Sequence, residues 1–419
     1  MKTLLKNAAV LTMESSDILS GCDVLFDAGK VLEVRPGINA DGAKVIDCTN
    51  KYIMPGLFDA HVHINSSDMH KLFIANGVTS VRNMWGYPRH LQWKEQAAKG
   101  EIVCPNIYST GPLTDGLAYW EGAKVVTTPE EAEAAVLEVM GDGFSYFKTY
   151  PSIPKDAFLH LLTVAKKHNF KVVGHGNTSI SWKTLADYGY YCCEHTNCLP
   201  DDESDIEYMA KSGMWLCPTH CVVVAGVEYF YNEKPLSEYP YKEYLTKSGM
   251  EFWENITKYQ KTEGRWDQIT ERNTDPNSTL TMPYTMENLV NRALTFIRTA
   301  GTDKIILGTD TPNPGVIAGF TIHEELQHLV NVYKLSTYEA IKAGTVNSAK
   351  HLGIENEKGK LAEGFDADIL IINGDPVQDV KNISKIEAVI KGGRLFDRAE
   401  LDAMLEEVRV MDDKDVVNV

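Results

Sequence analysis

The stretch PGLFDAHVH, residues 55–63, marks the point where this chain changes from one kind of structure to another. Its Pro-Gly pair favours a turn, and the apolar run that follows is typical of a buried β-strand. The strand ends in His61 and His63, which point to the same side because strand side chains alternate. Imidazole is a common zinc ligand, so the pair indicates a metal site, although two such histidines can also be purely structural.

Before this stretch the chain reads as a small β-sheet. Short β-branched runs at 8–13, 23–34 and 43–56 are separated by turn residues. Lys6 and Asn7 interrupt the first apolar run, so we interpret it as a strand rather than a signal peptide. Similar strand patterns return near the other end of the chain, and we expect residues 1–55 and 357–419 to form one small β-sandwich domain together.

After this stretch, predicted strands alternate with predicted helices. The strands are expected at 58–64, 77–84, 105–113, 144–150, 170–176, 190–195, 214–220 and 304–310, and the clearest helical patterns at 130–141, 156–168, 321–334 and 337–353. Repeated strand and helix indicate a parallel sheet, and eight strands are the number that closes a (β/α)₈ barrel. We therefore predict an α/β fold with a TIM-like barrel over 56–356. An aromatic-rich insertion at about 225–295 is expected to cover one end of the barrel.

Composition limits the classes of partner. The 419 residues include 41 Lys and Arg against 58 Asp and Glu, a net charge of −17, whereas nucleic-acid binding needs a basic face. No apolar run approaches the roughly 18 residues that span a membrane. We therefore expect a small-molecule substrate, neither nucleic acid nor membrane as a partner, and a possible homo-oligomer. Eight cysteines, with Cys192 and Cys193 adjacent, suit reduced thiols in the cytoplasm.

Four further residues that can bind metal or carry protons stand at the ends of predicted strands. They are Lys148, His175, His195 and Asp310. Each has a structural alternative: the lysine can extend to solvent, the histidines can be core residues, and the aspartate can cap a helix. However, the carboxyl ends of barrel strands meet at one mouth, where this fold places its chemistry. The set therefore predicts one site.

In combination, these motifs resemble those of the amidohydrolase superfamily of metal-dependent hydrolases. The resemblance rests on PGLFDAHVH, on the succession from Lys148 to Asp310, and on the closing GKLAEGFDADILII at 359–372. The sequence is most similar to the branch containing Xaa-Pro dipeptidases, related metallo-carboxypeptidases and ochratoxin-hydrolysing amidases. The resemblance covers nearly the whole chain.

The resemblance implies a site with two divalent metal ions, with zinc as our default. By its pattern His61 and His63 bind the first ion, His175 and His195 bind the second, and Lys148, carboxylated by CO₂, bridges them. Asp310 would bind the first ion and carry the proton. A hydroxide between the two ions would attack the carbonyl of a small peptide-like or N-acyl amino acid substrate and cleave its amide C–N bond.

Substrate contacts are assigned to residues near these strand ends. In the dipeptidase-like relatives a tyrosine after the seventh strand holds the substrate carboxylate, which implies this role for Tyr231. Tyr150, His220 and His323 are further candidates. His220 can equally be a half-buried histidine bonded to backbone, and His323 can belong to an amphipathic helix. We interpret the remaining histidines as surface or structural residues: His70, His90, His160, His168 and His351.

Two other functions compete with this hypothesis. A mononuclear deaminase or cyclic-amide hydrolase of the same fold needs His61, His63, one later histidine and Asp310, but no bridging lysine, so Lys148 discriminates between them. A non-catalytic relative that keeps the barrel as a scaffold typically lacks metal ligands, whereas every expected ligand type is present here.

Overall fold

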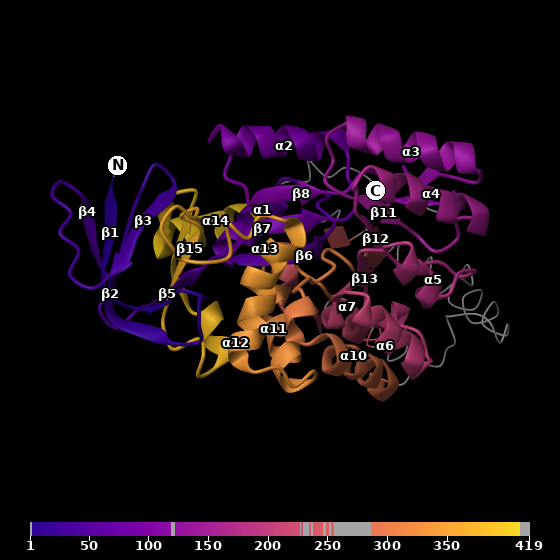
Figure 1. Ribbon diagram of the computed structural model, residues 1–419. Helices are drawn as coiled ribbons and strands as arrows, with labels where there is room; N and C mark the ends of the chain where they lie inside the picture. The colour runs from indigo at the N-terminus through magenta and orange to yellow at the C-terminus, as the bar shows by residue number, and fades with distance from the viewer. Residues whose placement is uncertain are drawn as a thin grey trace.

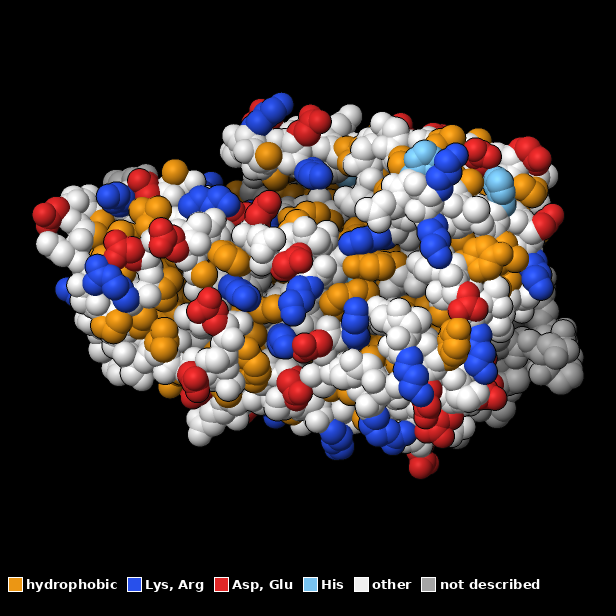
Figure 2. All heavy atoms as spheres, in the orientation of Figure 1, with side chains coloured by type: hydrophobic (Ala, Val, Ile, Leu, Met, Phe, Trp, Pro, Cys, Tyr) orange, Lys and Arg blue, Asp and Glu red, His pale blue; other side chains and the backbone are white. Residues whose placement is uncertain are grey.

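The computed structural model describes residues 2–118, 122–226, 228, 234–235, 238–245, 249–250, 253–254 and 286–410. Much of the predicted insertion, including Tyr231, lies outside these residues. Within the described part, no helix is both long and apolar enough to cross a bilayer. Acidic and basic side chains are interspersed over the face drawn in Figure 2.

One large sheet contains strands from both ends of the chain. It has eight strands, in the order β17-β16-β15-β5-β1-β2-β3 with β4 beside β1. Figure 1 shows the sheet to one side of the helices. The early strands are β1 (Thr3–Leu11), β2 (Ile18–Asp27), β3 (Lys30–Arg35), β4 (Lys44–Asp47) and β5 (Tyr52–Pro55), and the late strands are β15 (Ile369–Ile372), β16 (Ile386–Lys391) and β17 (Arg394–Asp397).

The two ends meet where β5 pairs antiparallel with β15. Leu5, Val24 and Ile53 from the early strands pack in one cluster with Ile369 and Ile390 from the late strands. The last described residues form a helix, α14 (Arg398–Val410), which contacts α1 (Asp68–Ala75). The C-terminal segment is therefore not entirely β, which corrects the sequence-based picture of this region.

Parallel strands follow the sheet. The first group is β6 (Leu57–Val62), β7 (Val78–Asn83) and β8 (Asn106–Ser109), and the second is β11 (Phe147–Thr149), β12 (Val172–Gly174), β13 (Cys192–Glu194) and β14 (Trp215–Cys217). A bridge between Thr110 and Tyr146 joins the two groups. Two short strands, β9 (Thr114–Asp115) and β10 (Lys124–Val125), extend the second group beside β11 and were not predicted.

The predicted eighth strand at 304–310 is wrong as a regular strand. The segment makes isolated parallel bridges instead, from Ile305 to Leu216 of β14 and from Thr311 to Val62 of β6. Asp310 has φ of 66°, so the backbone leaves the extended conformation there. The segment also lies very close to its neighbours, because a Cβ on Gly308 would lie 2.5 Å from Cys217 Sγ. These bridges nevertheless link β14 back to β6, so the hydrogen-bonded strands form a ring.

Helices surround this ring of strands. Besides α1 and α14 they are α2 (Pro88–Ala98), α3 (Pro129–Gly141), α4 (Lys155–Lys167), α5 (Trp182–Asp187), α6 (Glu203–Lys211), α7 (His220–Gly226), α10 (Met286–Ala300), α11 (Thr321–Asn331), α12 (Thr337–Lys342) and α13 (Ser348–Leu352). The start of α3 shows why the pattern predicted it: Thr128 accepts a hydrogen bond from the Glu131 N–H, and Pro129 occupies the first turn. The predicted helix at 337–353 is interrupted by a π-helical turn at Ala343–Asn347.

The ring has its own interior. Ala60, Val173 and Cys192 from three strands, Tyr146 just before β11 and Ile306 from the closing segment pack into one cluster. Their neighbours in sequence, such as Phe147, Val172 and Cys193, belong to the larger cluster that includes helix residues. Alternation along each strand therefore separates an inner face from a helix-covered face.

Candidate metal centre

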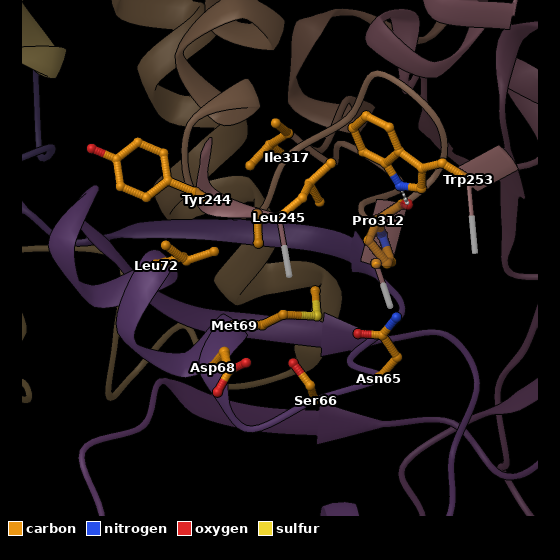
Figure 3. Close-up of a pocket in the computed structure, with 12 residues that line it drawn as sticks. Asn65, Ser66, Asp68, Met69, Leu72, Tyr244, Leu245, Trp253, Pro312 and Ile317 are labelled. Atoms are coloured by element: carbon orange, nitrogen blue, oxygen red, sulfur yellow. Dashed lines mark hydrogen bonds between the residues drawn. The ribbon is translucent and has the colours of Figure 1, made fainter. Parts of the chain in front are cut away.

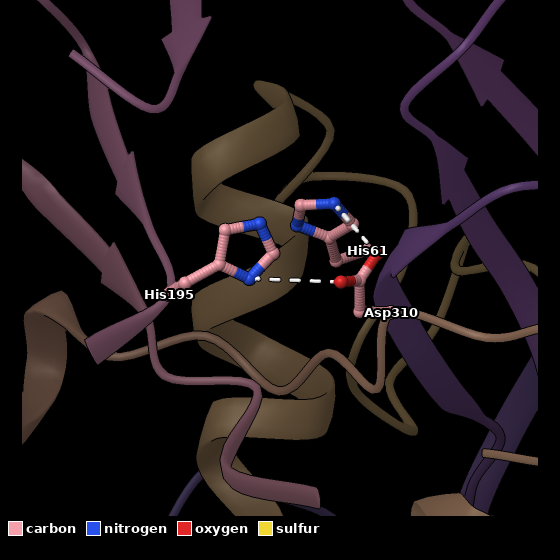
Figure 4. Close-up of side chains that lie close together, drawn as sticks. All are labelled: His61, His195 and Asp310. Atoms are coloured by element: carbon pink, nitrogen blue, oxygen red, sulfur yellow. Dashed lines mark ion pairs between the residues drawn. The ribbon is translucent and has the colours of Figure 1, made fainter. Parts of the chain in front are cut away.

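Three side chains that the sequence placed at strand ends meet in one buried cluster. Ligand atoms of His61, His195 and Asp310 all lie within 4.8 Å of one another (Figure 4). Asp310 Oδ1 lies 3.3 Å from His61 Nε2 and 3.0 Å from Nε2 of His63, and Asp310 Oδ2 lies 3.8 Å from His195 Nδ1. The carboxylate of Asp310 thus faces three imidazoles.

The other predicted ligands continue from this cluster. The rings of His175 and His195 have centroids 4.7 Å apart, and the ring of Tyr150 lies 4.2 Å from that of His175. Lys148 Nζ lies 5.4 Å from the centre of the Tyr150 ring. The structure thus brings all six predicted metal-site residues into one connected group, although the tightest part mixes ligands that the resemblance assigned to different ions.

The backbone is strained at two of these residues. His195 has φ of 71° and Asp310 has φ of 66°, in the left-handed region that non-glycine residues rarely adopt. Strict strand alternation would place His195 on the helix-covered face with Cys193. The turn at His195 instead directs its ring towards His61, while Cys193 packs in the outer cluster. Such conformations persist where the surrounding structure enforces them, and they are frequent at functional sites.

Burial sets the charge state of the site. It lowers the pKa of His61 and His175 well below the usual 6.5, and lowers that of His195 to about 4. Burial also lowers the pKa of the Lys148 ammonium, although Glu194 and Asp310 oppose the shift. For Asp310, burial acts to raise the pKa, but the nearby histidines outweigh it and the pKa is lowered. Neutral imidazoles around an ionised carboxylate are the protonation states that bind a divalent metal.

Several buried polar atoms at this site are of the kind that bind a metal ion. His61 Nε2, His175 Nδ1 and Lys148 Nζ are buried and have no hydrogen-bond partner within the described residues. An unsatisfied buried polar atom is costly, and native proteins rarely keep one without a reason. Imidazole nitrogen, carboxylate oxygen and a carboxylated lysine are donors that suit zinc. The residues present therefore fit the ions that the resemblance implies.

A second layer of polar residues supports the ligands, and the sequence reasoning did not identify it. Glu194 contacts His61 Nδ1, Thr219 Oγ1 lies 2.7 Å from His195 Nδ1, and Asp59 accepts a hydrogen bond from the backbone N–H of Thr309. A signal was present in the sequence, because Asp59, Arg82 and Glu194 are charged residues inside apolar strand patterns. Charges buried in this way are normally paired.

The proposed substrate residues have separate outcomes. Tyr150 lies beside His175 in the cluster. His220 is buried, shares a hydrogen bond of 2.7 Å with the Tyr333 hydroxyl and donates its backbone N–H to Glu325, so these partners are side chains and not the backbone of the structural alternative. His323 donates from Nε2 to the Asn76 carbonyl at the end of α1. Tyr231 lies outside the described residues.

A pocket lies between the loops that follow His63 and Asp310 (Figure 3). Its lining comes from the loop after His63, from α1, from the loop after Asp310 and from three short described parts of the insertion. Trp253 Nε1 donates to the Pro312 carbonyl over 2.8 Å, which ties the insertion to the second loop. Apolar side chains dominate the lining, among them Met69, Leu72, Leu245 and Ile317.

Comparison with known sequences gives one family and several partial relatives. The pattern of the amidohydrolase family matches residues 52–396. A dihydroorotase of Carboxydothermus hydrogenoformans is 32% identical over an alignment of 159 residues, which covers 34% of this chain and 35% of that protein. An adenine deaminase of Ruegeria is 22% identical over 425 residues, covering 94% of this chain and 57% of that protein. The chain thus spans well under two thirds of the length of these relatives.

Comparison with solved structures shows the fold over nearly the whole chain. A Xaa-Pro dipeptidase with bound methionine matches with a TM-score of 0.71 at 19% identity, covering 95% of this chain and all of that one. An ochratoxinase of Aspergillus niger matches with a TM-score of 0.69 at 19% identity, covering 94% and 95%. At such identities the likeness establishes the fold.

Proposed function

Because this chain belongs to the amidohydrolase family, as its motifs indicated, we propose that it is a metal-dependent hydrolase that cleaves the amide C–N bond of a small peptide-like or N-acyl amino acid substrate. The observation that carries the proposal is the buried cluster of His61, His195 and Asp310, with orphaned nitrogens on His61, His175 and Lys148 around it. In this interpretation the ring of strands is a (β/α)₈ barrel, and residues 1–55 and 357–419 form a composite β-sandwich domain.

We assign the ligands as the family pattern does. His61 and His63 would hold one ion, His175 and His195 a second, and carboxylated Lys148 would bridge them, with zinc as the default. The lowered pKa of the Lys148 ammonium supports this role, since only the neutral amine reacts with CO₂. When bound, such ions supply Lewis acidity and lower the pKa of a coordinated water to about 7.

Asp310 is our candidate for the catalytic proton carrier. Its carboxylate lies among three imidazoles and is ionised, so it has a free oxygen lone pair for a proton from the attacking water. The same carboxyl group would then donate that proton to the departing amine. Its backbone has a positive φ, a conformation that is frequent at functional sites.

The pocket of Figure 3 is our candidate for the part of the site that selects substrates. It lies between the loops that follow His63 and Asp310, so an apolar substituent next to the scissile bond can enter it. Apolar pockets with a few polar groups are typical of small-molecule sites. We keep the cytoplasm as the proposed compartment, since all eight cysteines are buried free thiols in the described part of the chain.

A second candidate is a mononuclear deaminase or cyclic-amide hydrolase. The observation that favours it is that the Asp310 carboxylate lies 3.0 to 3.8 Å from His61, His63 and His195, which together are the ligand set that a mononuclear site needs. The adenine deaminase and the dihydroorotase among the relatives carry these two chemistries in their names.

Elemental analysis separates the two functions. The protein is reconstituted with zinc and bicarbonate, freed of loose ions and measured for its zinc-to-protein ratio. A ratio near two, with amide hydrolysis in a screen of dipeptides and N-acyl amino acids, supports the proposal. A ratio near one, with ammonia release from amino-substituted heterocycles, supports the deaminase. Absence of bound zinc with no hydrolysis would contradict both.

A further inference from the structure

A chain of buried polar side chains runs from His61 to α13. His61 Nδ1 lies 2.9 Å from Glu194 Oε2, and Arg82 Nη2 lies 2.7 Å from each carboxylate oxygen of Glu194. On its other side, Arg82 Nη1 lies 2.7 Å from Nε2 of His351. All four residues are fully buried and come from β6, β13, β7 and α13.

The chemistry of these groups fixes the direction of each hydrogen bond. A guanidinium can only donate, so His351 must accept at Nε2 and is therefore neutral. The Glu194 carboxylate, paired with Arg82, accepts from both sides, so His61 must carry its hydrogen at Nδ1. The lone pair of His61 is then at Nε2, the nitrogen that faces Asp310 and has no hydrogen-bond partner in the described structure.

At the other end of this series of side chains, His351 is held by several contacts. The backbone carbonyl of His351 accepts hydrogen bonds from the hydroxyls of Tyr146 and Tyr191, over 3.1 and 2.9 Å, and from Lys171 Nζ over 3.0 Å. The His351 ring stacks on that of Tyr146 with their planes 8° apart. Arg82 also donates from Nε to the carbonyl of Ala60, the residue before His61.

If the ion pair of Arg82 and Glu194 only filled space in the core, it would be a poor source of stability. Apolar residues of similar volume often stabilise a core at least as well as a buried ion pair. Here the carboxylate of Glu194 contacts Nδ1 of His61, the nitrogen that would not bind the metal. A carboxylate in that position orients a metal-binding histidine.

We propose that Glu194, held in place by Arg82 and His351, is the positioning residue that fixes the tautomer and ring orientation of His61 for metal binding. The inference rests on the proposed metal site. It assigns His351, which lies in α13 far along the chain, an indirect role in that site.

Zinc affinity of the whole protein, measured by competition with a chromogenic chelator, tests the inference directly. Glu194→Gln removes the charge but keeps the size of the side chain, and we expect the dissociation constant for zinc to rise by about 10- to 100-fold. His351→Leu, which removes the acceptor for Arg82, should weaken zinc binding in the same direction. His351→Gln keeps an acceptor oxygen and should restore most of the affinity.

A matched control distinguishes positioning from general loss of stability. Lys358→Met breaks a different buried ion pair, that of Lys358 with Asp368, directly before β15 of the large sheet. It should lower the melting temperature of the metal-free protein without changing zinc affinity. With cobalt in place of zinc, the visible spectrum should change in Glu194→Gln and His351→Leu and stay unchanged in Lys358→Met.

The outcomes separate this inference from the proposed function. If Glu194→Gln and His351→Leu bind zinc as tightly as the wild type while only their melting temperatures fall, the inference is overturned and the proposed function stands. If the wild type itself binds no zinc, the proposed function fails and the inference fails with it. Should Glu194→Gln not fold, the comparison of His351→Leu with His351→Gln decides the question.

Discussion

The carboxylate of Asp59 accepts two hydrogen bonds from Thr309, one from its backbone N–H over 3.0 Å and one from its hydroxyl over 2.7 Å. The same carboxylate accepts the backbone N–H of His61 over 3.3 Å. Asp59 and Thr309 stand just before His61 and Asp310 in the sequence. One buried carboxylate thus holds together the two backbone segments that carry the proposed metal ligand and proton carrier.

Two substitutions of Asp59 should distinguish the loss of its hydrogen-bond acceptors from the loss of its negative charge. Asp59→Ala leaves the Thr309 N–H and hydroxyl without a partner in a fully buried place, which costs roughly 1–3 kcal/mol for each group. Asp59→Asn keeps an acceptor oxygen and should cost much less. Chemical denaturation of the metal-free protein measures both free energies of unfolding, and equal losses in the two variants would contradict the assigned role.

Asp310→Asn should abolish turnover while leaving zinc bound. The amide keeps the shape of the carboxylate but cannot accept and return the proton, so we expect the rate to fall by about two to four orders of magnitude. Turnover and zinc content are measured on the same preparation. Near-normal turnover would remove Asp310 from the mechanism, and loss of zinc with turnover would make it chiefly a ligand.

Lys148→Ala should lower zinc content towards one ion for each chain, because it removes the bridging ligand. A short carboxylic acid such as acetate or propionate, added at high concentration, should restore part of the second ion, since its carboxylate can occupy the space left by the lysine. Zinc content with and without the acid is the measurement. A variant that keeps two ions and full activity would show that Lys148 is no bridge.

Protonation of Asp368 should lower the free energy of unfolding in acid. Burial acts to raise its pKa, but Lys391 and Lys358 outweigh burial and hold the pKa at about 2, below the usual 3.8. Because the folded-state pKa is the lower one, the stabilisation is present above pH 3.8 and disappears as the pH falls towards 2. The shift corresponds to roughly 2 kcal/mol at neutral pH.

Asp368→Asn should therefore lose about that free energy at pH 7 and flatten the fall in stability below pH 4, as followed by denaturation at a series of pH values. The matched control is Asp402→Asn, which breaks an exposed ion pair with Arg398 and should change stability by less than about 1 kcal/mol. An unchanged acid profile in Asp368→Asn would contradict the assignment.

Filling the pocket should change substrate preference without changing metal content. Met69 is buried and lines the pocket (Figure 3), and Met69→Trp adds bulk where we expect an apolar substituent to bind. The kcat/KM ratio between substrates with a large and a small apolar group should fall by about 10-fold or more. Equal loss for both kinds of substrate would place the substituent elsewhere.

The sequence predicted the elements with strong local patterns well. The helix at 130–141 has its own capping residues, and strands such as 170–176 are short apolar runs, so local preferences suffice. The closing segment at 304–310 was predicted as a strand because its composition is apolar. Its true form depends on the close approach at Gly308 and on the left-handed turn at Asp310, which are tertiary effects.

The residues of the candidate site likewise include some that a local pattern predicts and others that only the tertiary structure connects. His61, Lys148 and Asp310 could be selected because metal-binding and proton-carrying residues at strand ends have a recognisable pattern. Glu194 and His351 could not be paired, since their connection passes through Arg82 and joins three elements that are distant in sequence. His195 was also placed in the site by its position at a strand end, but the positive φ that turns its ring there was beyond the pattern.

The pairing of β5 with β15 has a consequence for how the chain folds during synthesis. β5 leaves the ribosome early, but its partner β15 is made only after every strand of the ring has been translated. Until then one edge of β5 has no partner, and such edges invite association with other chains. The large sheet can therefore be completed only after the strands of the ring have been made, and chains truncated before β15 are expected to aggregate.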